Sequence, residues 1–284
     1  MASKETMRSP LDEKLPSPAQ AAGAGVPPRQ VPSSLVHEYR PKSAEYCVCV
    51  FVINENGKLL KQLGKMRPHV SLADVVIADG GSTDGSTTRE VLEPLGVNTL
   101  LVKTGPGKLG AQMRMAFGWA LDRGYKGVVC IDGNGKDGPE AIPEFIAKLE
   151  AGYDHIQGSR FIPGGISEHL PRSRWFGLKF IHAPLISLTS GFRYTDTTNG
   201  FRGYSRKLLE DSRVAVFRDA LIGYELHWYL AIRAAKLGFR VCETPVARRY
   251  PSYGPIPTKI SPVKGNLKMI QCLLATCLGH YDPS

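Results

Sequence analysis

The fold is signalled most clearly by VVCIDGNGKDGPE, which spans Val128 to Glu140. Four apolar residues, Val128 to Ile131, end at Asp132, where a polar, glycine-rich turn begins. Pro139 and Glu140 then have the composition of a helix start. A buried strand with a carboxylate at its carboxyl end is typical of α/β proteins that hold nucleotide phosphates or metals there.

Strand-like and helix-like segments alternate on both sides of this stretch. Apolar runs predict strands at 47–53, 74–81, 98–104, 126–132, 155–161 and 239–246. Helical spacing predicts helices at 57–66, 86–96, 108–124, 139–152, 172–191 and 224–238, with a final amphipathic helix in 261–279. The alternation predicts an α/β fold with a mostly parallel central sheet, helices on both faces and a site at the strands' carboxyl ends.

The first 44 residues differ in composition from the rest of the chain. They hold seven of the 21 prolines, together with Ser, Gln, Ala and Gly, and show no periodic apolar pattern. Such a segment cannot bury enough apolar surface to offset its ordering entropy. We therefore expect residues 1–44 to form a disordered tail, with ordered structure from near Tyr46.

The positive charge of the chain is concentrated in its C-terminal part. Lys and Arg number 18 against 18 Asp and Glu in residues 1–159, but 18 against 8 in residues 160–284. This excess predicts an anionic partner such as phosphate groups, an acidic substrate or a membrane surface. Zinc-finger spacing, RNA-binding aromatic motifs and basic heptads are missing from the sequence, which argues against a nucleic-acid partner.

Cysteine and apolar patterns indicate the compartment. The six cysteines have no paired metal-binding spacing, and four of them lie in apolar strand-like runs, so buried reduced thiols in a cytoplasmic protein are expected. No apolar run reaches the roughly 18 residues of a membrane span. The segments 180–192 and 269–279 are candidates for the core or for peripheral contact with the cytoplasmic membrane face.

A second glycine-rich turn follows the predicted strand at 74–81. In VVIADGGSTDGS (75–86), Gly81 and its neighbours let backbone approach a ligand closely, and Asp79 and Asp84 can accept hydrogen bonds from a base or ribose. The same residues also suit a solvated turn in which aspartate caps the backbone. Both interpretations stay open.

Six motifs in this order resemble the family 2 glycosyltransferases of GT-A fold: FVINEN, VVIADGGSTDGS, VVCIDGNGKDGPE, GSRFIPGG, DTTNGFRGYSR and GYELHWYLAIRAAKLGFRVCETPV. The similarity covers residues 46 to about 262 and is greatest with the dolichyl- and polyprenyl-phosphate sugar transferases. It implies inverting transfer of a sugar from a nucleotide-diphosphate sugar, with a UDP- or GDP-sugar as the expected donor. It also implies a GT-A domain at 45–250, then an active-site loop and amphipathic helix at 251–284.

The resemblance assigns roles to matching residues. Those implied in donor binding are Asn54, Glu55, Asp79, Gly81, Asp84, Lys108, Asp132, Lys136, Arg160, Arg248 and Lys259. Those implied in catalysis on the acceptor side are Asp196, Arg202 and Glu225. Asp132 and Asn134 match the two acids of the family's DxD metal motif.

The metal motif departs from the family pattern. Mg²⁺ and Mn²⁺ prefer carboxylate oxygens, whereas Asn134 is a neutral, weaker ligand. Lys136 brings a cation that would repel a metal or replace part of its charge, although Asp137 would compensate. Our hypothesis is a weakened metal site for Mg²⁺ or Mn²⁺ in which Lys136 helps to hold the diphosphate. The alternatives are metal-independent transfer and a Lys136 that points into solvent.

The sequence leaves two classes of acceptor molecule open, a soluble molecule with a hydroxyl group and a polyprenyl phosphate. A hydroxyl acceptor on a soluble molecule needs a general base, for which Glu225 and Asp196 are candidates, whereas an acceptor polyprenyl phosphate is already anionic. A nucleotidyltransferase-like enzyme or a non-catalytic nucleotide-sugar-binding protein with a degenerate metal site is the alternative function. The first strand is followed by FVINENGKLL, which lacks the glycine-rich basic loop of nucleotidyltransferases. A homo-oligomer also stays open.

Overall fold

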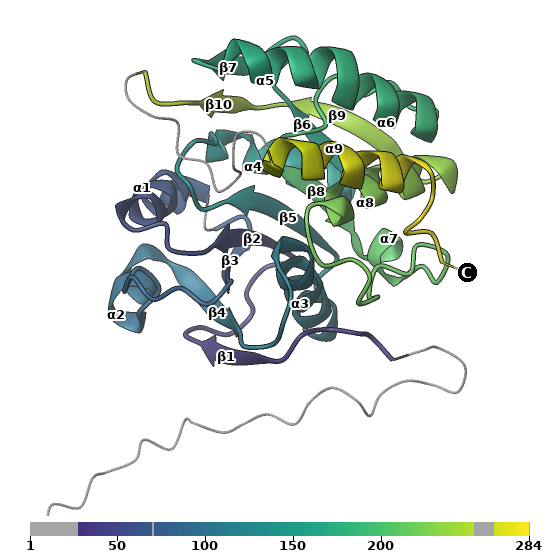
Figure 1. Cartoon of the computed structure of the whole chain (residues 1–284). Coiled ribbons are helices and arrows are strands. Elements are labelled where there is room, and N and C mark those ends of the chain that lie inside the picture. Colours follow the sequence, from purple (N-terminus) through teal and green to yellow (C-terminus); the bar gives the residue numbers. More distant parts are fainter. Residues whose placement is uncertain (1–27, 70, 253–263, 284) are drawn as a thin grey trace, which may run out of the picture.

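The computed structural model describes residues 28–69, 71–252 and 264–283, which form a large sheet covered by helices (Figure 1). In this part of the chain the large sheet has eight strands in the order β1-β4-β3-β2-β5-β8-β6-β9. Their bounds are β1 (Ser34–Glu38), β2 (Tyr46–Val52), β3 (Asp74–Asp79), β4 (Val97–Lys103), β5 (Gly127–Asp132), β6 (His155–Ser159), β8 (Arg202–Ser205) and β9 (Val241–Pro245). A second, two-stranded parallel sheet consists of β7 (Ile166–Glu168) and β10 (Ala247–Arg249).

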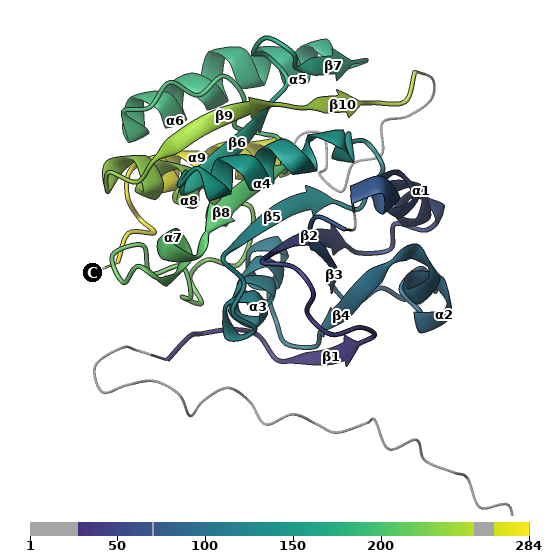
Figure 2. The same ribbon diagram turned by 180° about the vertical axis from the view of Figure 1, so that it is seen from behind.

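The helices cover both faces of the sheet. In the described residues they are α1 (Gly57–Met66), α2 (Arg89–Leu92), α3 (Leu109–Asp122), α4 (Ile142–Glu150), α5 (Arg172–Gly177), α6 (Ala183–Ser190), α7 (Arg206–Glu210), α8 (Glu225–Lys236) and α9 (Lys264–Cys277). Short 3₁₀ turns are η1 (Arg67–His69), η2 (Glu93–Leu95) and η3 (Pro139–Ala141), and a π-helical turn is η4 (Leu178–His182). α3, α8 and α9 lie over one face (Figure 1), and α1 and α4 lie over the other (Figure 2).

The central strand β2 shows why both faces need helices. Its seven residues are all buried, and successive side chains point to opposite faces. Cys47, Cys49 and Phe51 join the apolar cluster beneath α3 and α8. Val48 and Val50 join the cluster beneath α1 and α4. The predicted α/β architecture with helices on both faces is confirmed.

The described chain becomes ordered earlier than the sequence predicts. β1 lies within the segment expected to be disordered, and it pairs antiparallel with β4 from Ser34↔Lys103 to Glu38↔Thr99. The prediction is therefore wrong for these residues. Most side chains of β1 are exposed, so no apolar pattern marks the strand, and its backbone is ordered by hydrogen bonds to the edge of β4. Residues 1–27 lie outside the described part.

The sheet is mixed because of one short strand that the sequence does not reveal. β8 lies antiparallel between β5 and β6 and thereby makes β6 parallel to β5. Its sequence, RGYS, carries a buried arginine and no apolar run, so period-based prediction has no signal there. The β2, β3, β4 and β5 pairings are parallel, as predicted.

The C-terminal helices α6 and α9 pack against α8, which itself lies on the sheet. The predicted helix at 172–191 is present as the continuous run α5–η4–α6, and the predicted C-terminal helix is present as α9. α6, α8 and α9 share an apolar cluster that includes Ile186, Trp228 and Leu273. Within the described residues, no helix has the length and apolar character needed to cross a bilayer. The cysteines in this part are free thiols.

Candidate active site

The carboxyl ends of four parallel strands meet at one edge of the sheet. Asp79 is the last residue of β3, Asp132 is the last residue of β5, and Arg160 directly follows β6. The sequence places these three residues at strand ends, and the structure agrees. The pairing of β2 with both β3 and β5 brings their loops to the same edge.

Asp79 shapes the turn that follows β3. One carboxylate oxygen accepts hydrogen bonds from the backbone N–H of Gly81 (3.0 Å) and from the N–H and hydroxyl of Ser82 (2.9 and 2.7 Å). The other oxygen accepts from the Thr87 hydroxyl at 2.9 Å. Gly81 has a φ of +97°, which favours glycine. The capped-turn interpretation of Asp79 is therefore present in the structure, whereas contact with a base stays a prediction.

Hydrogen bonds join the loops after β2 and β3. The Asn54 side-chain oxygen accepts from the backbone N–H of Thr83 at 2.8 Å, and Asp84 accepts from the N–H of Asn56 at 2.7 Å. Burial alone would raise the pKa of Asp84, but its hydrogen bonds from Ser86 and Asn56 hold that pKa below the usual range. The donor-binding candidates on these loops thus form one connected surface.

Three other predicted donor-site residues have different surroundings. Glu55 is mostly buried and forms an ion pair with Lys58 at 3.6 Å. Lys108 is exposed and precedes α3, where its backbone N–H donates to the carbonyl of Ile222 at 2.9 Å. Lys259 lies outside the described residues.

The turn after β5 is organised by its own hydrogen bonds. The Asn134 amide donates to a carboxylate oxygen of Asp132 at 3.1 Å, and its carbonyl oxygen accepts from the backbone N–H of Lys136 at 3.2 Å. Gly135 has a φ of +73°, which lets the chain reverse between them. Asn134 therefore holds the turn with both ends of its amide.

Arg248 on β10 supplies a cation to this turn. Its Nη1 donates to both oxygens of Asp137, at 2.7 and 2.6 Å, and its Nη2 donates to Asp132 at 3.2 Å. Asp137 is fully buried. Burial raises the pKa of Asp137 against the opposing effect of Arg248. Asp137, the predicted compensating metal ligand, is thus engaged by an arginine.

Tyr250, which sequence reasoning missed, lies at the centre of a group of positive charges. The charged groups of Lys136, Arg174 and Arg248 lie 5.6, 5.9 and 5.8 Å from its ring centroid. Arg160 Nη1 donates to its hydroxyl at 3.3 Å. We refer to Lys136, Arg160, Arg174 and Arg248 as the cation cluster. The only sequence signal was an aromatic residue next to two arginines, which is a common surface pattern.

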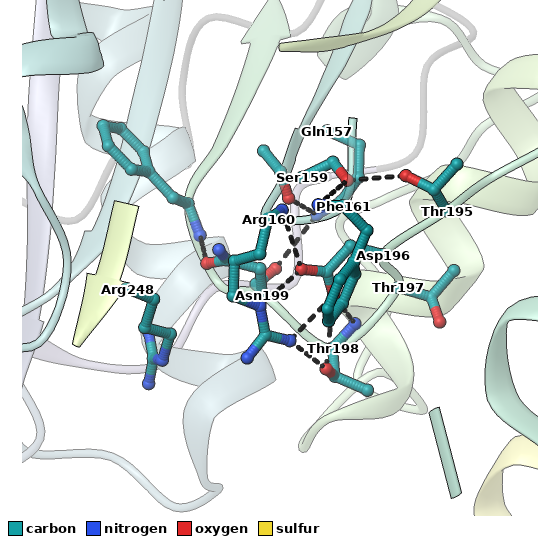
Figure 3. Close-up of polar contacts among 12 residues, drawn as sticks. Gln157, Ser159, Arg160, Phe161, Thr195, Asp196, Thr197, Thr198, Asn199 and Arg248 are labelled. Atoms are coloured by element: carbon teal, nitrogen blue, oxygen red, sulfur yellow. Dashed lines mark hydrogen bonds and ion pairs between the residues drawn. The ribbon is translucent and has the colours of Figure 1, made fainter. Parts of the chain in front are cut away.

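Arg160 is held by Asp196 in a buried bidentate ion pair (Figure 3). Its Nε and Nη2 donate to the two carboxylate oxygens at 2.6 and 3.0 Å, and Nη2 also donates to the Thr198 hydroxyl at 2.9 Å. Burial would raise the pKa of Asp196, but Arg160 and the hydrogen bond from Thr198 hold it below the usual value. A carboxylate in this state is a weak proton acceptor, which disfavours Asp196 as general base.

Arg202 is occupied by backbone carbonyls rather than directed at a ligand. Its guanidinium donates to the carbonyls of Asn199 (3.0 Å), Thr197 (2.9 Å) and His227. The side chain is almost fully buried. Burial and the nearby charge of Arg202 both lower the pKa of His227, so this histidine packs as a neutral ring. These contacts give Arg202 a positioning role.

Glu225 is the first residue of α8, and both oxygens of its carboxylate have polar contacts. One carboxylate oxygen accepts from the backbone N–H of Gly223, and the other lies 3.6 Å from the Cys272 thiol of α9. The side chain is mostly buried. Neither predicted base therefore presents an open carboxylate at the sheet edge.

The donor set of the β5 turn does not suit a divalent metal. Mg²⁺ and Mn²⁺ need several hard oxygen ligands, but Asn134 has its oxygen engaged and directs its N–H toward Asp132. Two cations, Lys136 in the turn and Arg248 from β10, lie beside these groups. Within the described ranges, no group of three or more His, Cys, Asp or Glu side chains could hold a metal ion.

Comparison with known proteins identifies the chain's relatives. A family model described as "Glycosyl transferase family 2" matches residues 47–213. The undecaprenyl-phosphate mannosyltransferase of Micrococcus luteus is 34% identical over 203 residues, which cover 68% of this chain and 79% of that protein. The polyprenol monophosphomannose synthase of Mycolicibacterium smegmatis is 29% identical over 203 residues, covering 70% of this chain and 75% of that protein.

Solved structures show the same fold. Glucosyl-3-phosphoglycerate synthase from Mycobacterium tuberculosis, in complex with Mn²⁺, uridine diphosphate and phosphoglyceric acid, superimposes with a TM-score of 0.59. The match covers 87% of this chain and 80% of that chain at 17% identity. The same enzyme has been solved with Mg²⁺ and uridine diphosphate. At this identity the likeness establishes the GT-A-like fold alone.

The Arg160–Asp196 pair predicts an acid-sensitive contribution to stability. Asp196→Asn should lower the free energy of unfolding at neutral pH by about 3 kcal/mol, because Arg160 would keep a buried charge without its carboxylate. The folded pKa of Asp196 is lowered, so its stabilisation is full above the unfolded pKa of about 3.9 and is lost as pH falls through the folded value. Urea unfolding from pH 7 to pH 3 should show the two proteins converging at the acid end. Asp211→Asn is the control, because Asp211 is 19% exposed and its partner Arg213 is 60% exposed, so this substitution should change stability less. Equal stabilities of wild type and Asp196→Asn at pH 7 would contradict the assignment.

The Arg248–Asp137 pair predicts that a second substitution will restore much of the stability that the first one removes. Arg248→Gln should lower the free energy of unfolding by about 3–5 kcal/mol, because Asp137 would remain buried without a counter-charge. The double substitution Asp137→Asn with Arg248→Gln should recover much of this loss in the same urea titration. Arg249→Gln, on the exposed side of β10, is the matched control and should have a small effect. A double variant no more stable than Arg248→Gln alone would show that the charges are not coupled.

Proposed function

The chain belongs to glycosyltransferase family 2, and from this premise we propose that it transfers a hexosyl group from a nucleotide-diphosphate sugar to a polyprenyl phosphate. Its relatives are named for mannosyl or hexosyl transfer to polyprenyl carriers, which supports this choice of acceptor. The observation that carries the proposal is an exposed aromatic surface that continues from the cation cluster.

The aromatic surface consists of Trp175, Phe176 and Phe180 on α5 and η4. Their ring centroids lie 4.6 to 5.9 Å apart, so the three rings contact one another. Phe176 and Phe180 are 61% and 58% exposed, which is unusual for contacting rings in a protein that has no further partner. Such a group suits insertion among lipid chains at a membrane surface.

The aromatic surface and the cation cluster share one helix. Arg174 lies over the Tyr250 ring and directly precedes Trp175. A cavity of about 360 Å³ is lined by Trp175 and Arg172 together with Phe161, Ser167, His169 and Leu170. A polyprenyl phosphate joins an anionic head to a long apolar chain, which matches cations next to aromatic side chains.

Helix α9 adds a second exposed apolar stripe. Leu267, Ile270, Leu274 and Leu278 recur at three- and four-residue spacing and are exposed, while Leu273 is buried against α6 and α8. A helix with apolar residues on its outer face favours contact along a membrane surface. We therefore propose a cytoplasmic protein that binds peripherally to the membrane.

The acceptor chemistry agrees with the state of the two carboxylates. A phosphate oxygen can attack the anomeric carbon directly, while the bond from that carbon to the donor diphosphate breaks and the diphosphate takes the electron pair. No proton must be removed from an anionic phosphate, so a general base is not required. Asp196 and Glu225, both engaged in buried contacts, then position Arg160 and the start of α8.

The remaining predicted site residues have donor-side roles in this proposal. Asn54, Gly81 and Asp84 lie on the loops after β2 and β3 that would receive the nucleotide, and the buried Asp79 and Glu55 support those loops. Lys108, at the start of α3, would lie toward its phosphates. Glycine-rich turns at strand ends allow this kind of close backbone approach.

Transfer itself can be tested with defined donors and acceptors. Incubation with UDP- and GDP-hexoses and a polyprenyl phosphate in vesicles should yield a hexosyl polyprenyl phosphate, detected by mass spectrometry. Arg174→Gln should raise KM for the polyprenyl phosphate by about tenfold, because one charge-assisted contact to the phosphate is lost. Phosphoglyceric acid serves as a soluble acceptor. A product formed only on the soluble acceptor, or on neither, would contradict the proposal.

Membrane contact predicts a loss of vesicle binding without loss of fold. Replacing both Phe176 and Phe180 by Ser should weaken co-sedimentation with anionic vesicles by about thirtyfold, because two half-exposed rings contribute about 1 kcal/mol each. The thermal midpoint should be unchanged, since neither ring belongs to the core. Leu72→Ser, 44% exposed and remote from α5, is the control and should bind normally. Equal binding of wild type and the double variant would rule out this surface.

A further inference from the structure

The turn whose sequence resembles a metal-binding motif has two side-chain cations beside it, Lys136 and Arg248. We propose that Lys136 and Arg248 replace the divalent cation, so that the donor diphosphate is bound, and its charge on departure stabilised, without metal. This inference rests on the proposed function, because it concerns the diphosphate of the same donor. It departs from the weakened metal site that the sequence alone suggested.

Within the described part of the chain, most side-chain oxygens of the turn already accept hydrogen bonds, and only the second carboxylate oxygen of Asp132 is left for a further ligand. Asp132 accepts from the Asn134 amide and from Arg248 Nη2 through the same oxygen, at 3.1 and 3.2 Å. Asp137 is fully buried and accepts from Arg248 through both oxygens. The guanidinium and the amide N–H compete with a divalent cation for the Asp132 carboxylate oxygen, and the guanidinium charge repels the cation.

The backbone fixes Arg248 in this position. β10 pairs with β7, with Arg248 opposite Ser167, and an isolated bridge joins Arg248 to Asp137. The backbone N–H of Arg249 also donates to the carbonyl of Lys136 at 2.9 Å. The guanidinium therefore reaches Asp132 because two backbone contacts hold its strand against the turn.

Lys136 shares the Tyr250 ring with Arg174 and Arg248, whose guanidinium carbons lie 5.9 and 5.8 Å from the ring centroid. The ammonium group also lies 5.6 Å from the Tyr250 ring centroid, within the cation cluster. A diphosphate bound here would relieve the repulsion between these cations and gain charge-assisted hydrogen bonds.

Such cations can perform the electrostatic part of the reaction. As the acceptor oxygen bonds to the anomeric carbon, the bond between that carbon and the diphosphate oxygen breaks, and the electron pair remains on the diphosphate. Positioned N–H donors stabilise this developing charge as a Lewis acid would. Lys136 and Arg248 lie at the carboxyl end of β5, where the family resemblance locates the donor phosphates.

The test measures nucleotide diphosphate binding separately from turnover. UDP and GDP are titrated into the full chain by calorimetry, once in EDTA and once in MnCl₂, and the tighter nucleotide is followed. Its dissociation constant in EDTA should lie within about threefold of the value in Mn²⁺. Lys136→Gln should weaken binding in EDTA by about tenfold, because one charge-assisted contact is lost. Lys61→Gln, an exposed lysine on α1, is the matched control and should bind as the wild type does.

The outcomes separate this inference from the proposed function. Binding about tenfold tighter in Mn²⁺ than in EDTA would overturn metal replacement, as would no binding of either nucleotide in EDTA. A Lys136→Gln protein that binds as tightly as Lys61→Gln would overturn the role of Lys136. Hexosyl transfer is then measured in EDTA and in Mn²⁺, and activity in Mn²⁺ alone also counts against the inference. Metal-independent binding without transfer to any acceptor would instead contradict the proposed function.

Discussion

The buried ion pair between Arg248 and Asp137 is the contact on which the geometry of the site depends. It joins the turn after β5 to β10, and through β10 to β7 in the loop after β6. A buried carboxylate without this arginine would carry a large desolvation cost, so the two segments cannot separate cheaply. The same arginine contacts Asp132, so the constraint that holds the loops together also determines the charge of the site.

The strand order of the mixed sheet brings Arg160 to the edge where Asp132 and Arg248 lie. β8 pairs antiparallel with both β5 and β6, so the loop carrying Arg160 lies at the same edge as Asp132. Arg202 then ties the DTTNGFR segment to α8 by donating to three carbonyls. The cation cluster is therefore assembled from four distant parts of the chain, and it adjoins the exposed rings of α5 and η4. A phosphate with a long apolar chain matches that combination.

Much of the architecture follows from local sequence patterns. The buried strands were predictable because their apolar runs end in polar turns, and α1, α3 and α8 because their spacing is helical. β1 and β8 were missed because neither has an apolar run and each is ordered by pairing with another strand. The motif residues Asp79, Asp132 and Arg160 were correctly placed at strand ends. Their hydrogen-bond partners were not predictable, because these come from residues distant in sequence or from loop conformation.

The sequence by itself determined the α/β fold, the family and the edge of the sheet at which polar residues gather, because these depend on periodicity and motif order. It also showed that Asn134 and Lys136 depart from the metal motif. Only the tertiary structure placed Arg248 against that motif, since Arg248 lies 116 residues from Asp132 and is held there by the pairing of β10 with β7. The charge that an anionic donor would meet depends on contacts between distant segments, which no local pattern encodes.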